Sequence, residues 1–394
     1  VNTSEVGFEW DPRAEWTQMY WQAWRAYRDQ FYDRNMLGLN WKQIGEKWAA
    51  MLPHLSSRAD LNVVLGKMVG EMGTGHAYVQ GGDTDVTLRG APIGKLGADF
   101  EVSGNAVRFK RIIRGDNTIE QYAGPLGRPG VEIADGDYLL AIDGQKVTAD
   151  TDFHNYLVDK VGKTVVLTVN SRNSESGARQ VTVRPIASET GLRYYDWVRQ
   201  NRAKVDAMSG GRIGYVHVPD TATTGITEFM RGYYGNSGKQ AMVIDERYNG
   251  GGFLPTFYIE YLQRQVFTGL TPRVGSNIPI YPYFPTGPKV LMVNHYAGSG
   301  GDMFPWLFRA AKLGPLLGTR TWGGLVGISG GVPFSDGGSV TVPAFGIYDI
   351  RTGLNLAENT GVEPDIEVDW TPDQFKRGED RKSTRLNSSH ANIS

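Results

Sequence analysis

The sequence contains no cysteine among its 394 residues, and this absence removes several kinds of chemistry. Disulfide bridges, zinc sites built from thiolates and cysteine nucleophiles are all excluded. The absence fits a reducing compartment. No apolar run approaches the ~20 residues that a membrane-spanning helix needs, so we expect no membrane segment.

An excess of charge of either sign is also missing. Lys and Arg number 41 against 42 for Asp and Glu, which gives a net charge of -1. This balance gives no reason to expect nucleic acid or an anionic membrane as a partner. The chain starts at Val1 without a visible signal peptide, and we interpret it as a fragment of a longer protein. Its length predicts two or three domains.

Residues 1–87 are predicted to form a helical domain. Aromatic residues recur at spacings of three and four from Trp16 to Tyr27, which is typical of a core-facing helix stripe. Ser57 and Asp60 have the spacing of a capping box before an apolar run. A glycine-rich turn, 73–78, follows and contains His76.

Residues 88–188 change to alternating, glycine-rich stretches that favour strands, such as 98–102. A turn, an apolar strand and the Asp143-Gly144 turn are similar to the core of a PDZ domain, in which 152–161 would be the helix beside a peptide groove. Another small β-barrel module is the alternative.

Residues 189–380 alternate strands with helices, which predicts an α/β domain with a covered, mixed but largely parallel sheet. The expected strands are 212–218, 240–245 and 289–294. The fold class is therefore α/β, with a helical N-terminal domain and an inserted β domain. Residues 381–394 show no periodicity and are predicted to be a disordered or non-native tail.

Ser299 is the candidate nucleophile, because it lies between a predicted strand and a predicted helix with glycines on both sides. Such a turn lets a substrate approach the backbone, and the helix start directs N–H groups at the site. An ordinary helix-capping serine is the alternative. A serine nucleophile needs a base, and of the six histidines we rank His76 first and His295 second. Oxyanion donors are expected in 249–252, which a sharp turn would also explain.

Six segments together resemble the C-terminal catalytic half of tricorn protease and its bacterial homologs, within the superfamily of tail-specific, carboxyl-terminal processing proteases. In order they are 73–78, the PDZ-like insert, 245–252, 296–299, 318–324 and 358–365. The resemblance implies a serine peptidase that acts on oligopeptides without a cofactor or metal. It also implies a hexamer, a cytoplasmic location and β-propeller domains before Val1.

The resemblance assigns a role to each candidate residue. His76 corresponds to the general base, Ser299 to the nucleophile and Glu358 to the acid that orients the imidazole. Without the resemblance, Glu358 would be interpreted as a solvent-exposed charge on a loop. The implied oxyanion donors are Gly251, with Gly250 as the alternative, and Gly300, and Thr74 and Gly75 are supporting positions.

Two positions depart from the archaeal pattern. Gly75 replaces a serine that bridges the histidine and the glutamate, so Thr74, a water or a direct contact must substitute; Gly300 replaces an aspartate. The related Ser–Lys mechanism is disfavoured because its lysine position falls at Gly323-Gly324. Two other functions compete: a non-catalytic peptide-binding protein that uses the PDZ-like groove, and an esterase, which would need a G-x-S-x-G turn.

Overall fold

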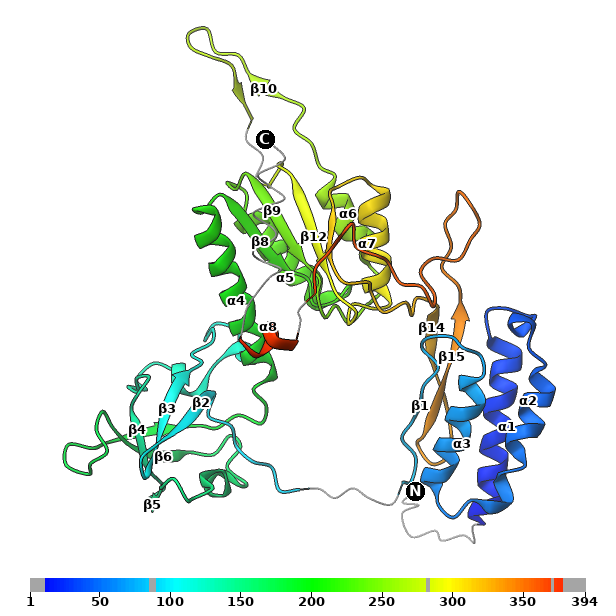
Figure 1. Ribbon diagram of the computed structural model, residues 1–394, viewed down its shortest axis with the longest axis horizontal. Helices are drawn as coiled ribbons and strands as arrows, with labels where there is room; N and C mark the ends of the chain where they lie inside the picture. The colour runs from blue at the N-terminus through cyan, green and yellow to red at the C-terminus, as the bar shows by residue number, and fades with distance from the viewer. Residues whose placement is uncertain (1–10, 85–89, 281–283, 370–371, 378–394) are drawn as a thin grey trace, which may run out of the picture. The chain divides into compact units, whose positions relative to one another are not determined.

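The structure is a computed structural model that describes residues 11–84, 90–280, 284–369 and 372–377. The predicted tail, 381–394, lies outside the described residues. The chain divides into two compact units: residues 1–87 with 205–394, and residues 88–204 (Figure 1). Each unit is described separately. Helix α4, Thr190–Ser209, connects one to the other.

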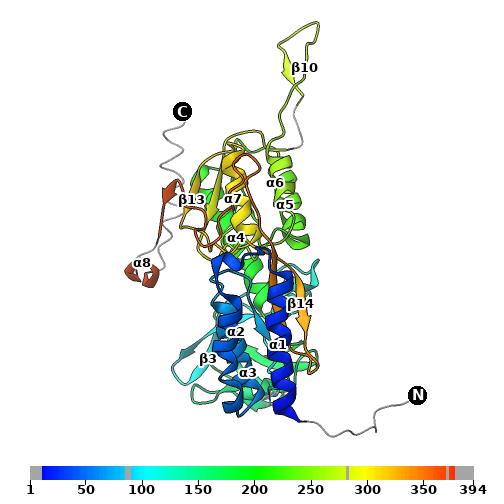
Figure 2. The same cartoon turned by 90° about the vertical axis from the view of Figure 1, so that its right-hand side faces the viewer.

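Three helices open the first unit: α1 (Pro12–Gln30), α2 (Trp41–Ala49) and α3 (Arg58–Gly70), which lie side by side in Figure 2. The predicted aromatic stripe of α1 is buried at Trp16, Tyr20 and Tyr27, whereas Trp24 is partly exposed. The capping box is confirmed: Ser57 N–H donates to Asp60 Oδ2 at 2.9 Å, and Asp60 N–H donates to Ser57 Oγ at 3.2 Å.

An antiparallel sheet packs on these helices, in the order β1 (Val79–Gln80), β15 (Ser339–Phe345), β14 (Gly327–Pro333). Val340 and Phe334 belong to the same core as α1 and α3. Strand β1 comes directly after the turn that contains His76, so this sheet fixes where that turn ends.

The α/β part has a five-stranded sheet in the order β16-β13-β12-β9-β8. Its strands are β8 (Ile213–His217), β9 (Ala241–Asp245), β12 (Lys289–Val293), β13 (Leu316–Gly318) and β16 (Ile366–Glu367). Every described pairing is parallel, so antiparallel pairing is confined to other sheets. The loops after β9, β12 and β13 therefore meet at one sheet edge.

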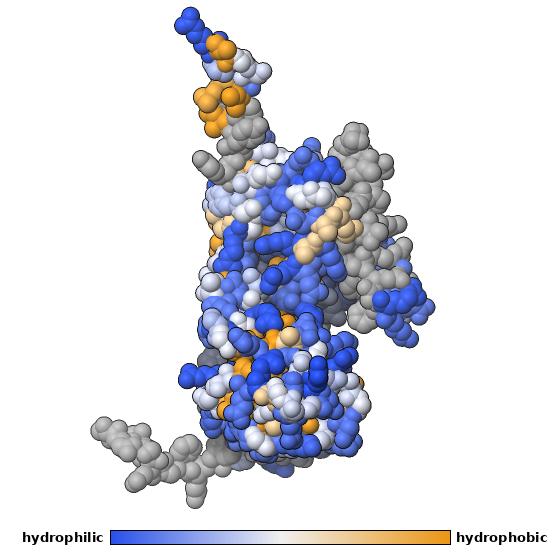
Figure 3. All heavy atoms as spheres, turned by 90° about the vertical axis from the view of Figure 1, so that its left-hand side faces the viewer, coloured by the Kyte–Doolittle hydropathy of each residue, from blue (hydrophilic) through white to orange (hydrophobic). Residues whose placement is uncertain are grey.

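Helices α5 (Thr223–Gly235), α6 (Pro255–Leu262) and α7 (Gly300–Ala310) contribute buried aromatic residues to the core over this sheet. A short helix, α8 (Pro372–Lys376), follows β16. A two-stranded hairpin, β10 (Gly269–Leu270) with β11 (Ile278–Pro279), projects beyond α6 and carries exposed apolar side chains (Figure 3). Phe267 and Val274 are 84% and 86% exposed.

The second unit is a β domain with the strand order β2-β3-β4-β6-β7, in which β5 pairs with β4. The strands are β2 (Ala98–Ser103), β3 (Ala106–Ile112), β4 (Tyr138–Ile142), β5 (Gln145–Lys146), β6 (Val165–Asn170) and β7 (Arg179–Val183). The helix expected over 152–161 is only a 3-10 helix, Phe153–Leu157, because Val158 is already extended.

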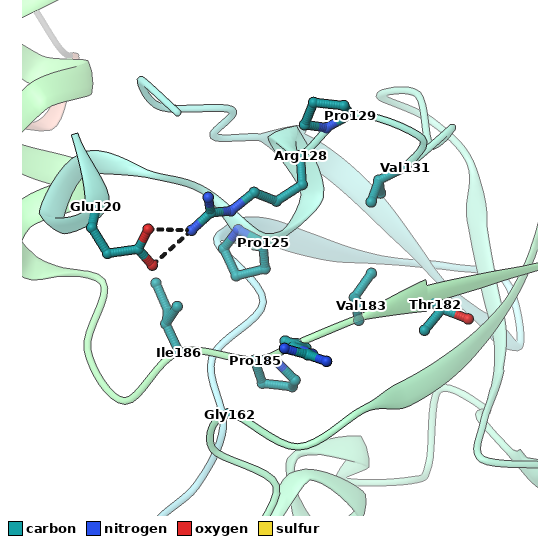
Figure 4. Close-up of a pocket in the computed structure, with 11 residues that line it drawn as sticks. Glu120, Pro125, Arg128, Pro129, Val131, Gly162, Thr182, Val183, Pro185 and Ile186 are labelled. Atoms are coloured by element: carbon teal, nitrogen blue, oxygen red, sulfur yellow. Dashed lines mark hydrogen bonds and ion pairs between the residues drawn. The ribbon is translucent and has the colours of Figure 1, made fainter. Parts of the chain in front are cut away.

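A cavity of about 560 Å³ opens on this unit (Figure 4). Pro125, Pro185 and Ile186 line it, and Arg128 donates to Glu120 at its edge, at 2.7 Å. None of the residues that line it comes from the 3-10 helix Phe153–Leu157, although Gly162 directly follows the range 152–161 that is expected to border the peptide groove.

Candidate active site

Ser299 lies where the sequence predicts it, between β12 and α7. It occupies the N-cap position of α7 with φ 59° and ψ -117°, a backbone conformation that non-glycine residues rarely adopt. Such strain is concentrated at functional sites. The side chain is partly exposed, while the flanking Gly298 and Gly300 are buried.

Asp302 is the main support of the Ser299 loop. Its Oδ2 accepts from Ser299 N–H at 2.9 Å and from Gly324 N–H at 3.2 Å. Its Oδ1 accepts from Thr321 Oγ1 at 2.5 Å and from Gly323 N–H at 2.8 Å. The residue is fully buried. Sequence reasoning did not assign it a role, although the Ser-x-x-Asp spacing of a capping box was visible.

The predicted oxyanion loop lies beside Ser299. A Cβ on Gly251 would be 2.7 Å from Ser299 Cβ, and Gly251 has φ +83°, so only glycine fits. Its N–H donates to Asn249 Oδ1 at 2.8 Å. The Gly250 N–H donates to Pro219 O at 2.9 Å. Gly251 is thus closer to the nucleophile, but its amide is engaged by a side chain.

His76 and His295 have different environments. His76 is half-buried, and its ring centroid is 5.4 Å from that of Trp322. Its Nδ1 is buried without a hydrogen-bond partner among the described residues. Burial lowers the pKa of His76, and the negative charge of Glu358 opposes this shift. His295 is exposed, and its ring lies 4.1 Å from the ring of Tyr296.

Glu358 is held by three backbone amides. Its Oε1 accepts from Gly75 N–H at 2.7 Å, and its Oε2 accepts from Leu325 and Val326 N–H at 2.6 and 2.8 Å. The contact to the histidine turn is therefore direct, through the backbone of the residue before His76. Thr74 does not bridge the two in the described structure, where its Oγ1 is buried without a partner.

Residues 322–326 join the histidine turn to the serine loop. A Cβ on Gly75 would lie 2.8 Å from Gly324 Cα, and Gly324 also donates to Asp302. The Trp322 N–H donates to Ala297 O at 2.9 Å, two residues before Ser299. Its ring meets that of His76. Trp322 was not predicted as a site residue, and no spacing in the sequence indicates it.

Two tyrosines flank the loops that surround Ser299. The rings of Tyr248 and Tyr296 stack with centroids 5.3 Å apart and are 50% and 61% exposed. Asn294 Oδ1 accepts from both backbone N–H groups, at 3.0 and 3.2 Å. The pair is thus held in place on the loops after β9 and β12, at the sheet edge that also carries Ser299.

Among the described residues, 11–377 with its gaps, no group of three or more His, Asp or Glu residues could hold a metal ion. No helix there is long and apolar enough to cross a membrane.

Comparisons with known proteins agree with this architecture. Residues 12–70 match the tricorn protease C1 domain, 94–188 the tricorn protease PDZ domain and 212–368 peptidase family S41. Ser299 thus lies within the part of the chain that matches peptidase family S41.

The relatives covering nearly all of this chain define the family more closely. A tricorn-like protease C-terminal subunit of Sulfurisphaera tokodaii is 36% identical over 96% of this chain and 44% of the relative. Tricorn protease of Thermoplasma acidophilum is 32% identical over 93% and 34%. A crystal structure of tricorn protease matches with a TM-score of 0.89 and 31% identity, over 99% and 38%.

The chain belongs to the tricorn protease family and corresponds to its C-terminal part. It spans less than half the length of the relatives that it matches.

Proposed function

We propose that this chain is a serine endopeptidase that hydrolyses oligopeptides, with Ser299 as the nucleophile and His76 as the general base. The observation that carries the proposal is that the histidine turn and the serine loop both contact residues 322–326. Glu358 adds a bond to the backbone of the residue before His76. If Ser299 only capped α7, its role would not require a histidine on a neighbouring turn.

The reaction follows from the chemistry of these groups. His76 takes the Ser299 hydroxyl proton as Oγ attacks the peptide carbonyl, and then gives it to the leaving amine. His76 next takes a proton from water as the water oxygen attacks the acyl-enzyme, and it returns this proton to Ser299 Oγ as the ester bond breaks and the acid is released. Because burial lowers the pKa of His76, the imidazole is neutral and able to accept a proton at pH 7. The carboxylate of Glu358 stabilises the imidazolium that forms.

The oxyanion donors that we propose are the N–H groups of Gly300 and Gly251. Gly300 begins α7, where N–H groups lack partners within the helix and the dipole favours negative charge. Gly251 can contribute only when its bond to Asn249 Oδ1 is weakened or shared.

The wider properties of the family extend the proposal. We propose a homo-oligomer, with a hexamer as the expected state, a cytoplasmic location and peptide substrates delivered by other proteases. The match to less than half of each relative supports further domains in the complete protein. The three-domain division at 87 and 188 also stays a prediction.

Hydrolysis of a peptide library, followed by mass spectrometry, tests the proposal. Wild type is expected to release internal cleavage products, while Ser299→Ala releases none and His295→Ala matches wild type. Cleavage by Ser299→Ala at the wild-type rate would refute it. Binding of peptides to residues 88–204 without any cleavage would favour the alternative, a non-catalytic peptide-binding protein.

A further inference from the structure

A buried glutamate behind the serine loop has no place in the mechanism above. Glu246 comes directly after β9 and has no exposed surface. Neither carboxyl oxygen has a hydrogen-bond partner within the described structure. An ionised carboxylate without partners is costly to bury, because nothing in the protein replaces the hydration that the charge loses. Glu246 therefore needs an explanation.

The strand alternation shows which side Glu246 faces. Asp245 belongs to one side, where it accepts from Tyr215 Oη at 2.8 Å and from Arg247 Nη2 at 2.6 Å. Met242 and Ile244 belong to the other side, within the core formed with α6 and α7. Since alternate residues share a side, Glu246 faces that apolar core.

Two titratable groups act on Glu246, and a third responds to its charge. Asp302 of α7 and Asp245 are near enough for their charges to disfavour a second charge, and the charge of Glu246 in turn acts on Tyr258 of α6. Asp245 is already paired with Arg247. That leaves Glu246 and Asp302, whose negative charges would oppose each other.

The hydrogen-bond donors around the two carboxyl groups indicate which of them carries the negative charge. Asp302 accepts four hydrogen bonds, two at each oxygen, so neither oxygen has room for a proton. Glu246 accepts none. Burial and the Asp302 charge raise the pKa of Glu246 well above its usual value. Burial raises the pKa of Asp302 as well, but its four hydrogen-bond donors oppose that shift, whereas Glu246 has no donor to oppose its own. The proton therefore belongs to Glu246 and the charge to Asp302.

We propose that Glu246 is a positioning residue that acts as a neutral carboxylic acid beneath α7. While it stays neutral, Asp302 is the single charge of the pair and keeps its bonds to Ser299, Thr321, Gly323 and Gly324. Loss of the Glu246 proton would place a second carboxylate in the same apolar space. The bonds that align the serine loop with residues 322–326 would then weaken.

Unfolding equilibria at pH 5.5, 6.5 and 7.5 test the protonation. Because folding raises the pKa of Glu246 above its unfolded value of about 4.3, the wild type takes up a proton on folding. Its stabilisation is complete below the unfolded pKa and is lost as the pH rises. Relative to Glu246→Gln, the wild-type folding constant should fall as the pH rises, by up to about tenfold per pH unit. A pH-independent ratio would overturn the proposal.

Infrared spectroscopy supplies a readout independent of unfolding. At pH 7 the wild type minus Glu246→Gln difference should contain the carbonyl band of a protonated carboxylic acid, whereas a carboxylate band would overturn the proposal. Glu246→Met, which matches the length of glutamate, serves if the Gln variant does not fold. Glu260→Gln, on an exposed site of α6, is the control and should show neither effect.

The positioning role rests on the proposed function and needs a kinetic test. We expect kcat to fall on the alkaline side in wild type at unchanged KM, and Glu246→Gln to abolish this fall. Identical alkaline profiles would contradict the role. Absence of peptidase activity in wild type would refute the proposed function alone, since the unfolding and infrared measurements need no turnover.

Discussion

At the scale of single residues, the contacts of Glu358 differ most from those that the family resemblance implies. Its carboxylate is bonded to three backbone amides and to no imidazole nitrogen among the described contacts. It acts on His76 in two ways: it fixes the preceding backbone and its charge raises the pKa of the ring against the effect of burial.

Replacing Glu358 with Gln tests the electrostatic part. Without the opposing charge, the pKa of His76 should fall further, so the acidic limb of kcat/KM moves to lower pH. The plateau should drop by roughly 10²-fold or more as imidazolium stabilisation is lost. The pH profile of peptide hydrolysis checks both effects. An acidic limb that moves to higher pH would contradict the assignment.

The tyrosine pair defines a second prediction. Tyr248→Ala and Tyr296→Ala should each lower kcat/KM for peptides with aromatic side chains by roughly 3- to 10-fold, since one aromatic contact is worth about 0.5–1.5 kcal/mol. Peptides with small polar side chains should be less affected. Tyr234→Ala, at an exposed position of α5, is the control. Equal losses for all peptides would show that the pair has no role in selectivity.

At the scale of elements, the histidine turn is adapted to a glycine before His76. A serine there would place its Cβ 2.8 Å from Gly324 Cα, and backbone atoms cannot move as a flexible side chain does. Gly75→Ser should therefore reduce kcat instead of restoring a stronger relay. Gly75→Ala carries the same Cβ without a hydroxyl, so the ratio of the two rates isolates the hydroxyl. Higher activity of Gly75→Ser than of wild type would refute this account.

Much of this element arrangement was predictable. The capping box of α3 and the strands around Ser299 follow from local patterns, and the structure contains them. The helix expected over 152–161 from the likeness to a PDZ domain is wrong, because the chain forms only a 3-10 helix, Phe153–Leu157, before Val158 becomes extended. Trp322 and Glu246 could not be assigned a role from sequence, since their importance depends on contacts between distant loops, and for Asp302 the sequence showed only the spacing of a capping box.

At the scale of the whole molecule, one buried ion pair ties the helices to the β14–β15 hairpin. Arg58 Nε lies 2.5 Å from Asp336 Oδ2, and both side chains are nearly inaccessible, at 3% and 8%. Asp336→Ala should leave the guanidinium buried without its partner and cost about 3–5 kcal/mol. Chemical denaturation measures this loss. A cost below about 1 kcal/mol would show that the pair does not hold these parts together.

The measurement that tests the central claim most directly is labelling by a fluorophosphonate, with mass spectrometric mapping of the modified residue. The account predicts one label, on Ser299, its loss in Ser299→Ala, and much slower labelling of His76→Ala than of His295→Ala. A label on another serine, or equal rates for the two histidine variants, would contradict it.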